Sequence, residues 1–426
     1  MISAEEWGWD LVIWRHFRIE VPSSWEMLRY SRKMEGGRCS FADRYQIRLE
    51  MNWRRVPGAP DTARMLSDYE SRLTEQGVEE LERIQQLEWE GFVGREDNQT
   101  VSRFGCYFAL ESCLLEIVCR WPAARNQEVE RRIVASVAEV PAQDGTRRWR
   151  AFGMDLAVPE GLELHDCRQQ AARAEFSFRA ARGVDEYRFM RLGMVPTWLD
   201  RPVRTWLTTQ VPPGVQIDEE KARTVDGDEI AQVTGRAKRW CRGLRLRRPV
   251  YEARAGVDRS DARLYFVSRQ GATPGGDLEL PRCMEPRLVA AGTGAGASPP
   301  EDGAAEPWVA MLAARPRRNE AARVEANENG SVVLSVKRTS RKNLRWPLSW
   351  IVPVRAEGRT ALDGIGRLIW ELCDGARTIE EIIDAFAARH DLTFHESRVS
   401  VTDYVKELIR RGILAIEVSP IESECA

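Results

Sequence analysis

The chain has 426 residues, a length that suggests two to four domains, and 43% of them are hydrophobic, which is enough for a core in each. The 63 basic and 65 acidic side chains leave a formal net charge of −2, which argues against an overall role in binding nucleic acid or an anionic membrane. No apolar run approaches the length of a membrane-spanning helix, and the N-terminus has no secretory signal. We therefore expect a cytoplasmic protein.

The cysteines and histidines follow no metal-binding pattern. The nine cysteines include no Cys-x-x-Cys pair, and Cys106, Cys113 and Cys119 are too far apart for a zinc knuckle. His390 and His395 flank the end of an expected helix, where solvated side chains are more common than ligands. We therefore expect reduced thiols, no metal and no cofactor.

The first 285 residues contain one pattern twice. The first copy opens at Trp14 and reaches a Val-Pro pair at Pro22, and the second opens at Trp149 and reaches a Val-Pro pair at Pro159. Strands and helices are expected in the first copy at 45–53, 61–76, 101–120 and 127–140, and in the second at 186–194, 201–210 and 262–269. We predict two related domains, residues 1–141 and 146–281.

Strands, a helix and further strands in about 135 residues favour an α+β sandwich over a solenoid in each copy. The predicted fold class is therefore α+β, with two tandem sandwich domains followed by a C-terminal winged-helix domain. The opening of each copy, an aromatic residue, an alternating strand and Val-Pro, resembles the PsbP-like fold. That resemblance implies a binding or assembly role.

A basic segment, Arg236 to Arg248, lies in the second copy. It holds seven basic residues in 13 positions. Such runs are usually solvated hairpin tips. The alternative is a docking site for an acidic partner or nucleic acid, because clustered arginines bind carboxylates and phosphates. That docking site would be formed by Arg239, Trp240, Arg242 and Arg245.

Residues 282–328 are rich in Ala, Gly and Pro and predict a flexible linker, with one short helix near 307–314. The last domain, 329–420, begins with a strand at 331–336 and a basic turn. A second strand follows at 346–354. Pro347 and Pro353 lack amide protons, so we expect this second strand at a sheet edge.

Three helical patterns follow in the last domain. In the first, 362–375, apolar residues share one face and Gly375 suits the C-terminal cap. The second, 378–386, opens with a capping box formed by Thr378 and Glu381. The third, 399–412, ends at Gly412 and leads to a closing strand at 413–418. Three short helices and a strand predict a winged-helix-like unit.

The same residues, Leu-Asp-x-x-Gly-x-x-Ile-Trp-x-Leu-Cys-Asp-Gly from Leu362 and Leu-Ile-Arg-Arg-Gly-Ile-Leu from Leu408, resemble the PqqD family over about 75 residues. PqqD proteins belong to pyrroloquinoline quinone synthesis, and the wider group is the peptide-recognition element of ribosomal peptide modification. The resemblance implies a non-catalytic adaptor or chaperone. It would hold a precursor peptide as an added strand and present it to a modifying enzyme, often a radical-SAM protein.

We expect the peptide in a groove between the second strand and the third helix. The expected contacts are Trp350, Ile351, Val352, Val401, Tyr404, Val405 and Leu408. Most of the helix residues also suit a core, so Tyr404, at the margin of the apolar stripe, is the strongest candidate. Trp370 lies off the stripe of its helix and either packs under the hairpin of Trp346 and Trp350 or serves as an exposed docking anchor.

No motif for catalysis is present: neither a nucleophile elbow nor a phosphate-binding loop occurs in the context that its chemistry requires. We therefore expect no enzyme. The main alternative is a winged helix that binds DNA. From Arg355 to Pro420 acidic residues outnumber basic ones, which disfavours phosphate binding, although the basic turn before this stretch adds charge of the right sign.

Overall fold

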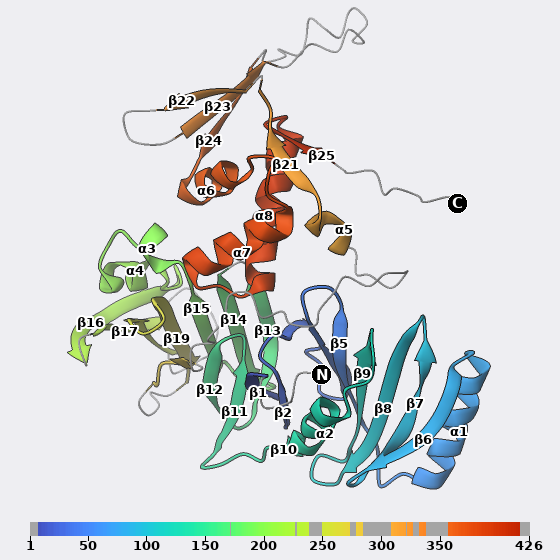
Figure 1. The fold of residues 1–426 in the computed structure, drawn as a ribbon. Helices are drawn as coiled ribbons and strands as arrows, with labels where there is room; N and C mark the ends of the chain where they lie inside the picture. Colours follow the sequence, from blue (N-terminus) through green and yellow to red (C-terminus); the bar gives the residue numbers. More distant parts are fainter. Residues whose placement is uncertain are drawn as a thin grey trace, which may run out of the picture. The chain divides into compact units, whose positions relative to one another are not determined.

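A computed structural model describes residues 7–170, 172–225, 228–237, 249–272, 278–283, 308–320, 322–326, 332–337 and 357–417 (Figure 1). The chain forms two compact units, Met1–Glu306 and Pro307–Ala426. The first consists of antiparallel sheets with a few helices, and the second of helices with short strands. The fold is thus mixed α and β.

The first unit contains a seven-stranded antiparallel sheet in its N-terminal half. Its strand order is β3 (Glu26–Tyr30), β4 (Gly36–Ala42), β5 (Ile47–Arg55), β9 (Cys113–Trp121), β8 (Gln99–Phe108), β7 (Trp89–Glu96) and β6 (Glu79–Gln86). Helix α1 (Thr62–Glu75) connects β5 to β6, and the side chain of Asp61 caps it by accepting from the amide of Arg64. The predicted helix at 61–76 agrees with α1 and its two caps.

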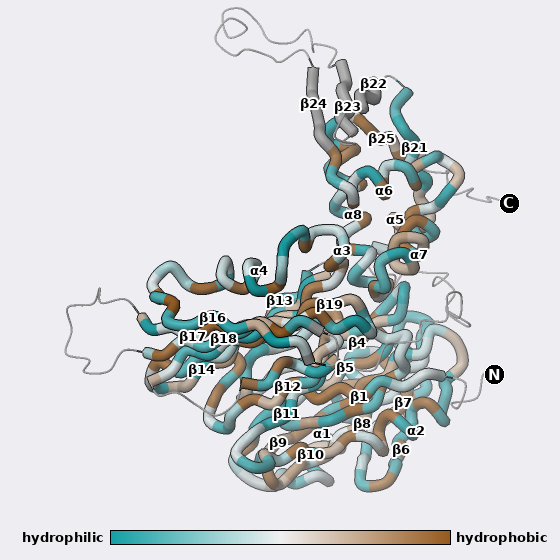
Figure 2. Tube along the Cα trace, turned by 90° about the vertical axis from the view of Figure 1, so that its left-hand side faces the viewer, coloured by the Kyte–Doolittle hydropathy of each residue, from teal (hydrophilic) through white to brown (hydrophobic). Residues whose placement is uncertain are grey.

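A second seven-stranded sheet in the same unit repeats this strand order. It runs β13 (Leu162–Gln170), β14 (Arg173–Ala180), β15 (Glu186–Leu192), β19 (Arg263–Gly271), β18 (Val250–Asp258), β17 (Asp228–Ala237) and β16 (Val215–Val225). Two short helices, α3 (Val195–Trp198) and α4 (Val203–Thr209), stand between β15 and β16, where α1 stands in the first half. Brown and teal stretches alternate along these strands in Figure 2, as sheets with one buried face require.

A six-stranded sheet joins the two halves. Its order is β10 (Ala138–Glu139), β2 (Phe17–Pro22), β1 (Trp9–Trp14), β11 (Thr146–Ala151), β12 (Met154–Pro159) and β20 (Arg282–Cys283). Strand β1 pairs with β11 at Ile13 and Arg150. The two sandwiches predicted as separate domains therefore share a sheet and lie in one compact unit.

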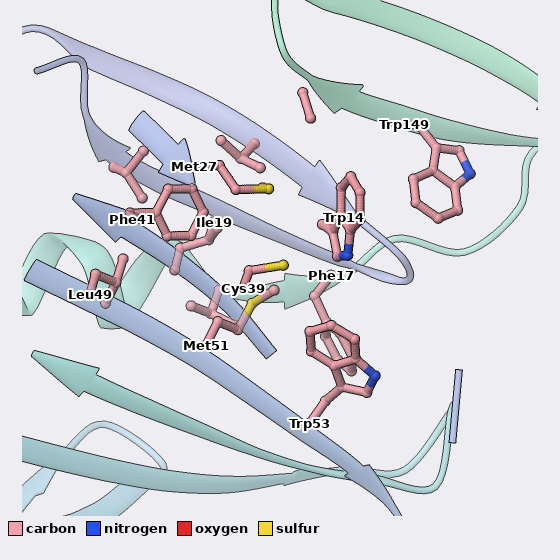
Figure 3. Close-up of a cluster of buried hydrophobic side chains, with 14 of the residues drawn as sticks. Trp14, Phe17, Ile19, Met27, Cys39, Phe41, Leu49, Met51, Trp53 and Trp149 are labelled. Atoms are coloured by element: carbon pink, nitrogen blue, oxygen red, sulfur yellow. The ribbon is translucent and has the colours of Figure 1, made fainter. Parts of the chain in front are cut away.

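The core of this unit also crosses between the halves. Trp14, which is fully buried, has its ring centroid 5.5 Å from that of Trp149 in an edge-to-face contact (Figure 3). The centroid of Phe176 lies 6.0 Å from that of Trp14, with the two rings tilted. Aromatic contacts of this kind stabilise the core beyond the apolar area that the rings bury. Both halves thus depend on the same cluster for stability.

Helix α2 (Gln127–Ser136) is shorter than the predicted helix at 127–140. Val137 has an extended conformation, and the next two residues pair with β2 as β10. The apolar residues Val129, Ile133 and Val134 are buried as their spacing predicts. Pairing with a neighbouring strand explains why the helix ends before its apolar pattern does.

The second unit contains α5 (Val309–Leu312), β21 (Arg315–Arg318), β22 (Ala322–Ala326), β23 (Val332–Lys337), β24 (Glu357–Leu362), α6 (Gly364–Leu372), α7 (Ile379–His390), α8 (Phe394–Arg410) and β25 (Leu414–Glu417). The short helix predicted near 307–314 agrees with α5, but the linker predicted around it is wrong for 315–318 and 322–326, because β21 pairs with β25 and β22 with β23. Strand β21, with its three arginines and a proline, lacks the apolar alternation that marks a strand.

The helices of this unit follow their capping signals. Thr378 and Glu381 form the predicted capping box of α7. A second box, Thr393 with Glu396, starts α8 five residues before the predicted helix. Among the residues that the structure describes, no helix is long and apolar enough to cross a membrane.

Candidate functional site

Strand β24 forms one edge of a three-stranded sheet in the second unit. The order is β22-β23-β24, and β23 pairs with β24 from Val332 opposite Leu362 to Lys337 opposite Glu357. Within the described part of the chain, no strand pairs with the other side of β24. The predicted edge strand at 346–354, with Trp350, Ile351 and Val352, lies outside the described residues.

The end of β24 leads directly into α6 through Asp363. One carboxylate oxygen of Asp363 caps α6 by accepting from the amide of Gly366 at 2.7 Å, and the other accepts from the Tyr404 hydroxyl at 2.5 Å. A Cβ on residue 366 would lie 2.6 Å from the Tyr404 ring, so glycine is required for this approach. Burial, and then the bond to Asp363, raises the pKa of Tyr404 above its ordinary value of 10. Tyr404 is therefore held beside the end of the edge strand as a neutral, oriented side chain.

The other helix residues predicted to contact a peptide lie in the core. Val401, Val405 and Leu408 are at most 2% exposed, whereas Tyr404 is half-buried. Of these four residues, Tyr404 is the one with side-chain surface left exposed. The sequence could identify the apolar stripe of α8 but not which side of it a partner reaches.

Trp370 is half-buried, and its partner in the structure is Arg318 of β21. The guanidinium carbon of Arg318 lies 4.5 Å from the centre of the Trp370 ring. The same guanidinium donates to the backbone carbonyl of Trp370 at 3.1 Å, at the end of α6. Arg318 was assigned to a linker by the sequence, so this cation–π contact was not predicted.

Strand β21 has partners on both sides. It pairs with β25 on one side. On the other, the amide of Gly375 donates to the carbonyl of Pro316 at 3.0 Å, and Arg317 forms a bridge with Asp374. The β21 strand is therefore not free to accept an added strand.

His395 is buried and not solvated as predicted. It is 3% exposed and packs edge-on against Trp308 at 5.6 Å between ring centroids. Its Nδ1 accepts from Nε of Arg398 at 3.0 Å, and Arg398 also lies over the Trp308 ring. Segment 308–312 thus covers the start of α8, and this contact explains why His395 is buried.

The basic docking segment, Arg239, Trp240, Arg242 and Arg245, lies outside the described residues. The nearest described member of the run, Arg236, has its Nε 3.3 Å from a carboxylate oxygen of Asp218. The docking role of the segment stays a prediction.

Three side chains in the first unit, Asp258, Asp261 and Cys283, place their ligand atoms within 4.8 Å of one another, a grouping that the sequence did not reveal. Tyr265 donates to Asp261 at 2.6 Å, and the thiol of Cys283 lies 3.0 Å from the same oxygen. Burial, followed by the contact with Asp261, raises the pKa of Cys283 to about 11. The thiol is thus protonated at neutral pH, and the cluster is satisfied by its own hydrogen bonds.

A search of curated proteins found no match to this chain. A Pseudomonas aeruginosa protein of unknown function, PA94, titled a putative regulator, is 14% identical over 30% of this chain and 83% of its own, with a TM-score of 0.18. The apo immunity protein TplEi of the T6SS of Pseudomonas aeruginosa is 10% identical over 65% of this chain and 91% of its own, with a TM-score of 0.26. Scores this low carry no argument about fold or function, and the PsbP-like resemblance stays a prediction.

One matched region contains or directly adjoins strand β24, which is an edge among the described strands, the three helices that follow it and the closing strand β25. Residues 332–414 of this chain match the family described as coenzyme PQQ synthesis protein D, PqqD, so that its C-terminal part is a PqqD domain.

Proposed function

We propose that this protein is a non-catalytic adaptor whose PqqD domain binds a precursor peptide along the open edge of β24 and presents it to a modifying enzyme. The observation that carries the proposal is that β24 is an edge strand that runs directly into α6 beside Tyr404. A radical-SAM protein is the modifying enzyme that the family suggests.

Strand addition supplies both affinity and selectivity at such an edge. The outward amides and carbonyls of β24 would bond to the peptide backbone, while alternate peptide side chains would pack toward α6 and α8. An unpaired edge is otherwise a liability that proteins cover or interrupt. The contrast with β21, which is bonded on both sides, favours β24 as the docking edge.

Tyr404 would contact the peptide near the Asp363 end of β24. Its ring packs on the backbone of α6 at Gly366, and its hydroxyl is already bonded to Asp363. The ring would therefore offer the peptide an apolar surface of fixed orientation. Val401, Val405 and Leu408 would support this surface from the core.

DNA binding is the second candidate, but several of the described arginines of this unit have structural partners. Arg318 donates to the end of α6, and Arg315 donates to the carbonyl of Ala376. Arg410 and Arg411 pair with Glu407. An arginine that leaves such a partner to bind a phosphate loses a contact that stabilises the fold, which disfavours this candidate.

The test uses peptides selected against the full chain from a display library of random twelve-residue sequences. Hydrogen exchange of the amides in β24 should slow when a selected peptide is added. Protection confined to other surfaces would contradict the proposed edge. A salt-dependent shift of a random DNA duplex without any peptide effect would favour the second candidate.

Adjacent proline substitutions in β24 give a matched pair for the same test. Amides of neighbouring strand residues point to opposite sides, so of Arg359→Pro and Thr360→Pro one removes an amide bonded to β23 and the other an amide facing the open edge. We expect one variant to destabilise the unit and the other to keep its stability but lose peptide binding by about tenfold, which corresponds to 1.4 kcal/mol. Equal peptide affinity in the stable variant and the parent would reject docking at this edge.

A further inference from the structure

His16 occupies the second position of the two-residue turn between β1 and β2 in the first unit. Its backbone carbonyl accepts from the amide of Val140 at 2.7 Å, so the turn is tied to the segment that follows β10. The side chain is only 12% exposed. Each of its two ring nitrogens faces a group from another element of this unit, and the chemistry of those groups decides which nitrogen carries a proton.

The Nε2 atom of His16 faces a weak acceptor. It lies 3.0 Å from the sulfur of Met34, in the loop between β3 and β4. Glu35, the next residue of this loop, attracts Arg15 electrostatically. Because a thioether accepts hydrogen bonds and has no proton to donate, Nε2 carries the proton when the ring is neutral. The other nitrogen, Nδ1, then has a free lone pair.

The Nδ1 atom of His16 faces two groups with opposite requirements. Oε1 of Glu111, in the turn between β8 and β9, lies 2.7 Å away and can only accept. Nη1 of Arg147, in β11, contacts the same nitrogen and can only donate. A neutral ring can therefore accept from Arg147 but has no proton for Glu111. A protonated ring can donate to Glu111 but is repelled by Arg147.

The other charges around this site come from four elements. Nη2 of Arg55, at the end of β5, lies 3.1 Å from Oε2 of Glu111, and Nη1 of Arg147 lies 3.5 Å from Oε1. The carboxylate of Glu139 in β10 accepts from the amide of Glu111. Burial lowers the pKa of Arg147, and the charge of Glu160, after β12, opposes this shift. Carboxylates and guanidinium groups ordinarily stay charged between pH 5 and 8, so the imidazole is the group here whose charge changes in that range.

The corresponding turn of the second half has no imidazole, because Gly153 occupies the position of His16 in the β11–β12 hairpin. At the turn between β18 and β19, Asp261 accepts from Tyr265 at 2.6 Å and lies 3.0 Å from the thiol of Cys283. Burial, and then the bonds to Asp261, raise the pKa of both Tyr265 and Cys283, so both stay neutral between pH 5 and 8. Of the two hairpins, the one with His16 thus carries the group whose charge changes near neutral pH.

We propose that His16 is a proton-dependent link between the six-stranded sheet and the first seven-stranded sheet. When the ring is neutral, Nδ1 accepts from Arg147, which belongs to the same six-stranded sheet as the β1–β2 hairpin. When the ring is protonated, Nδ1 donates to Glu111, between two strands of the seven-stranded sheet. Protonation therefore adds a charged contact between the two sheets as the pH falls through the titration range of imidazole. This link is independent of peptide binding by the second unit.

NMR of the full chain, with its four histidines labelled, follows the titration of His16, and the variant His16→Gln identifies its signal. Glu111→Gln should lower the pH midpoint of His16 by about 1 unit, because the protonated ring loses its anionic acceptor. Arg147→Met should raise the midpoint by a similar amount, because it removes both the donor to the neutral ring and the charge that repels the protonated ring. Arg132→Met, which removes a partner of Glu20 instead, is the matched control and should leave the midpoint unchanged. His165, in the second half, serves as the internal control in every variant.

A measurement on the parent chain keeps the test valid should Glu111→Gln or Arg147→Met not fold. One arginine Nε–H resonance should shift with the same midpoint as His16, because Arg147 loses its acceptor when the ring is protonated. Arg147→Lys, which keeps the charge, should remove that resonance from the spectrum. A histidine that titrates without an exchange of partners would move no arginine resonance, and this result would overturn the proposal. Midpoints that stay unchanged in both variants, or that move in the same direction, would overturn it as well.

Discussion

The β1–β2 and β11–β12 hairpins have the same two-residue turn but use it differently. Arg15 and Phe152 each occupy the first turn position with left-handed backbone, with φ of 61° and 51°. Phe152 packs its ring against Tyr30 at 5.2 Å and Phe176 at 5.8 Å between centroids. Arg15 instead carries a buried charge against Trp149.

This difference shows that the same turn backbone can carry either an apolar or a charged side chain into the core. The two halves share their strand order, and the two hairpins meet where Ile13 of β1 pairs with Arg150 of β11. An apolar turn residue adds its ring to the core, whereas a cation at the same position brings a buried charge beside Trp149. Differences between the halves should therefore have measurable consequences.

The largest expected effect is on the aromatic cluster that both halves share. Trp14→Ala removes a fully buried ring that contacts Tyr30, Trp149 and Phe176, and we expect a loss of about 3–5 kcal/mol in the free energy of unfolding. Urea unfolding measures this loss. Leu110→Ala, at a position that is 77% exposed, is the control and should change stability by less than about 0.5 kcal/mol. A loss confined to signals from the first half would contradict a shared core.

The next effect concerns α2, which follows β9 in the first half. Arg125→Ala would leave the carboxylate of Glu130 buried without its cation, and we expect a loss of about 3 kcal/mol. Combining it with Glu130→Gln should restore part of this stability, because the uncompensated charge is gone while the amide can still accept from Trp121. Chemical denaturation of both variants measures the coupling. Additive losses in the double variant would argue against a charge effect.

A smaller, pH-dependent effect distinguishes two ion pairs on corresponding strands of the two halves, Arg188 with Glu175 and Arg38 with Glu50. Burial raises the pKa of Glu175, but Arg188 and Arg173 outweigh burial and hold it below 4.5. Because the folded-state pKa is depressed, this pair stabilises the fold above about pH 4.5, and the contribution is lost as the pH falls below that value. Arg188→Gln should therefore cost about 1 kcal/mol at pH 7 and progressively less as the pH falls below 4.5.

The first half offers a matched control for this pH effect. Arg38 and Glu50 occupy the corresponding strands β4 and β5 with opposite charges, but their closest charged atoms are 4.0 Å apart instead of 2.5 Å. Arg38→Gln should thus change the pH dependence less than Arg188→Gln does. Stability curves from pH 3 to pH 7 measure the difference, and equal changes would show that the distance between the charges is immaterial.

The smallest effect is at the hydroxyl of Tyr404. Tyr404→Phe removes the bond to Asp363 but keeps the ring on Gly366, and we expect a loss of about 1 kcal/mol in the stability of the second unit. Peptide affinity should change little if the ring makes the contact, whereas Tyr404→Ala should weaken it. Titration of a selected peptide against both variants measures the two affinities. If the alanine variant binds the peptide as tightly as the parent, Tyr404 does not contact the peptide.

The sequence predicted correctly those elements whose capping residues or apolar spacing agree with the way the element packs in the fold. The capping box of Thr378 and Glu381 marked the start of α7 correctly, and the helical pattern at 61–76 agrees with α1. It failed for β21, where Arg318 donates to the carbonyl of Trp370 in α6, a residue 52 positions away in the sequence. Likewise, nothing in the local sequence distinguishes Arg15 from an exposed turn residue, because its burial depends on Trp149 from the other half.

The sheet that joins the halves also has a consequence for fragments of this protein. A fragment of residues 7–141 would keep β1 but lose its neighbour β11. Strand β1, which is interior in the intact sheet, would then be an edge strand with unpaired amides. Two such fragments can restore the lost pairing with each other, since the β1–β11 contact is antiparallel. The severed first half should therefore sediment as a dimer, reproducing with two chains the symmetry that the intact protein contains in one.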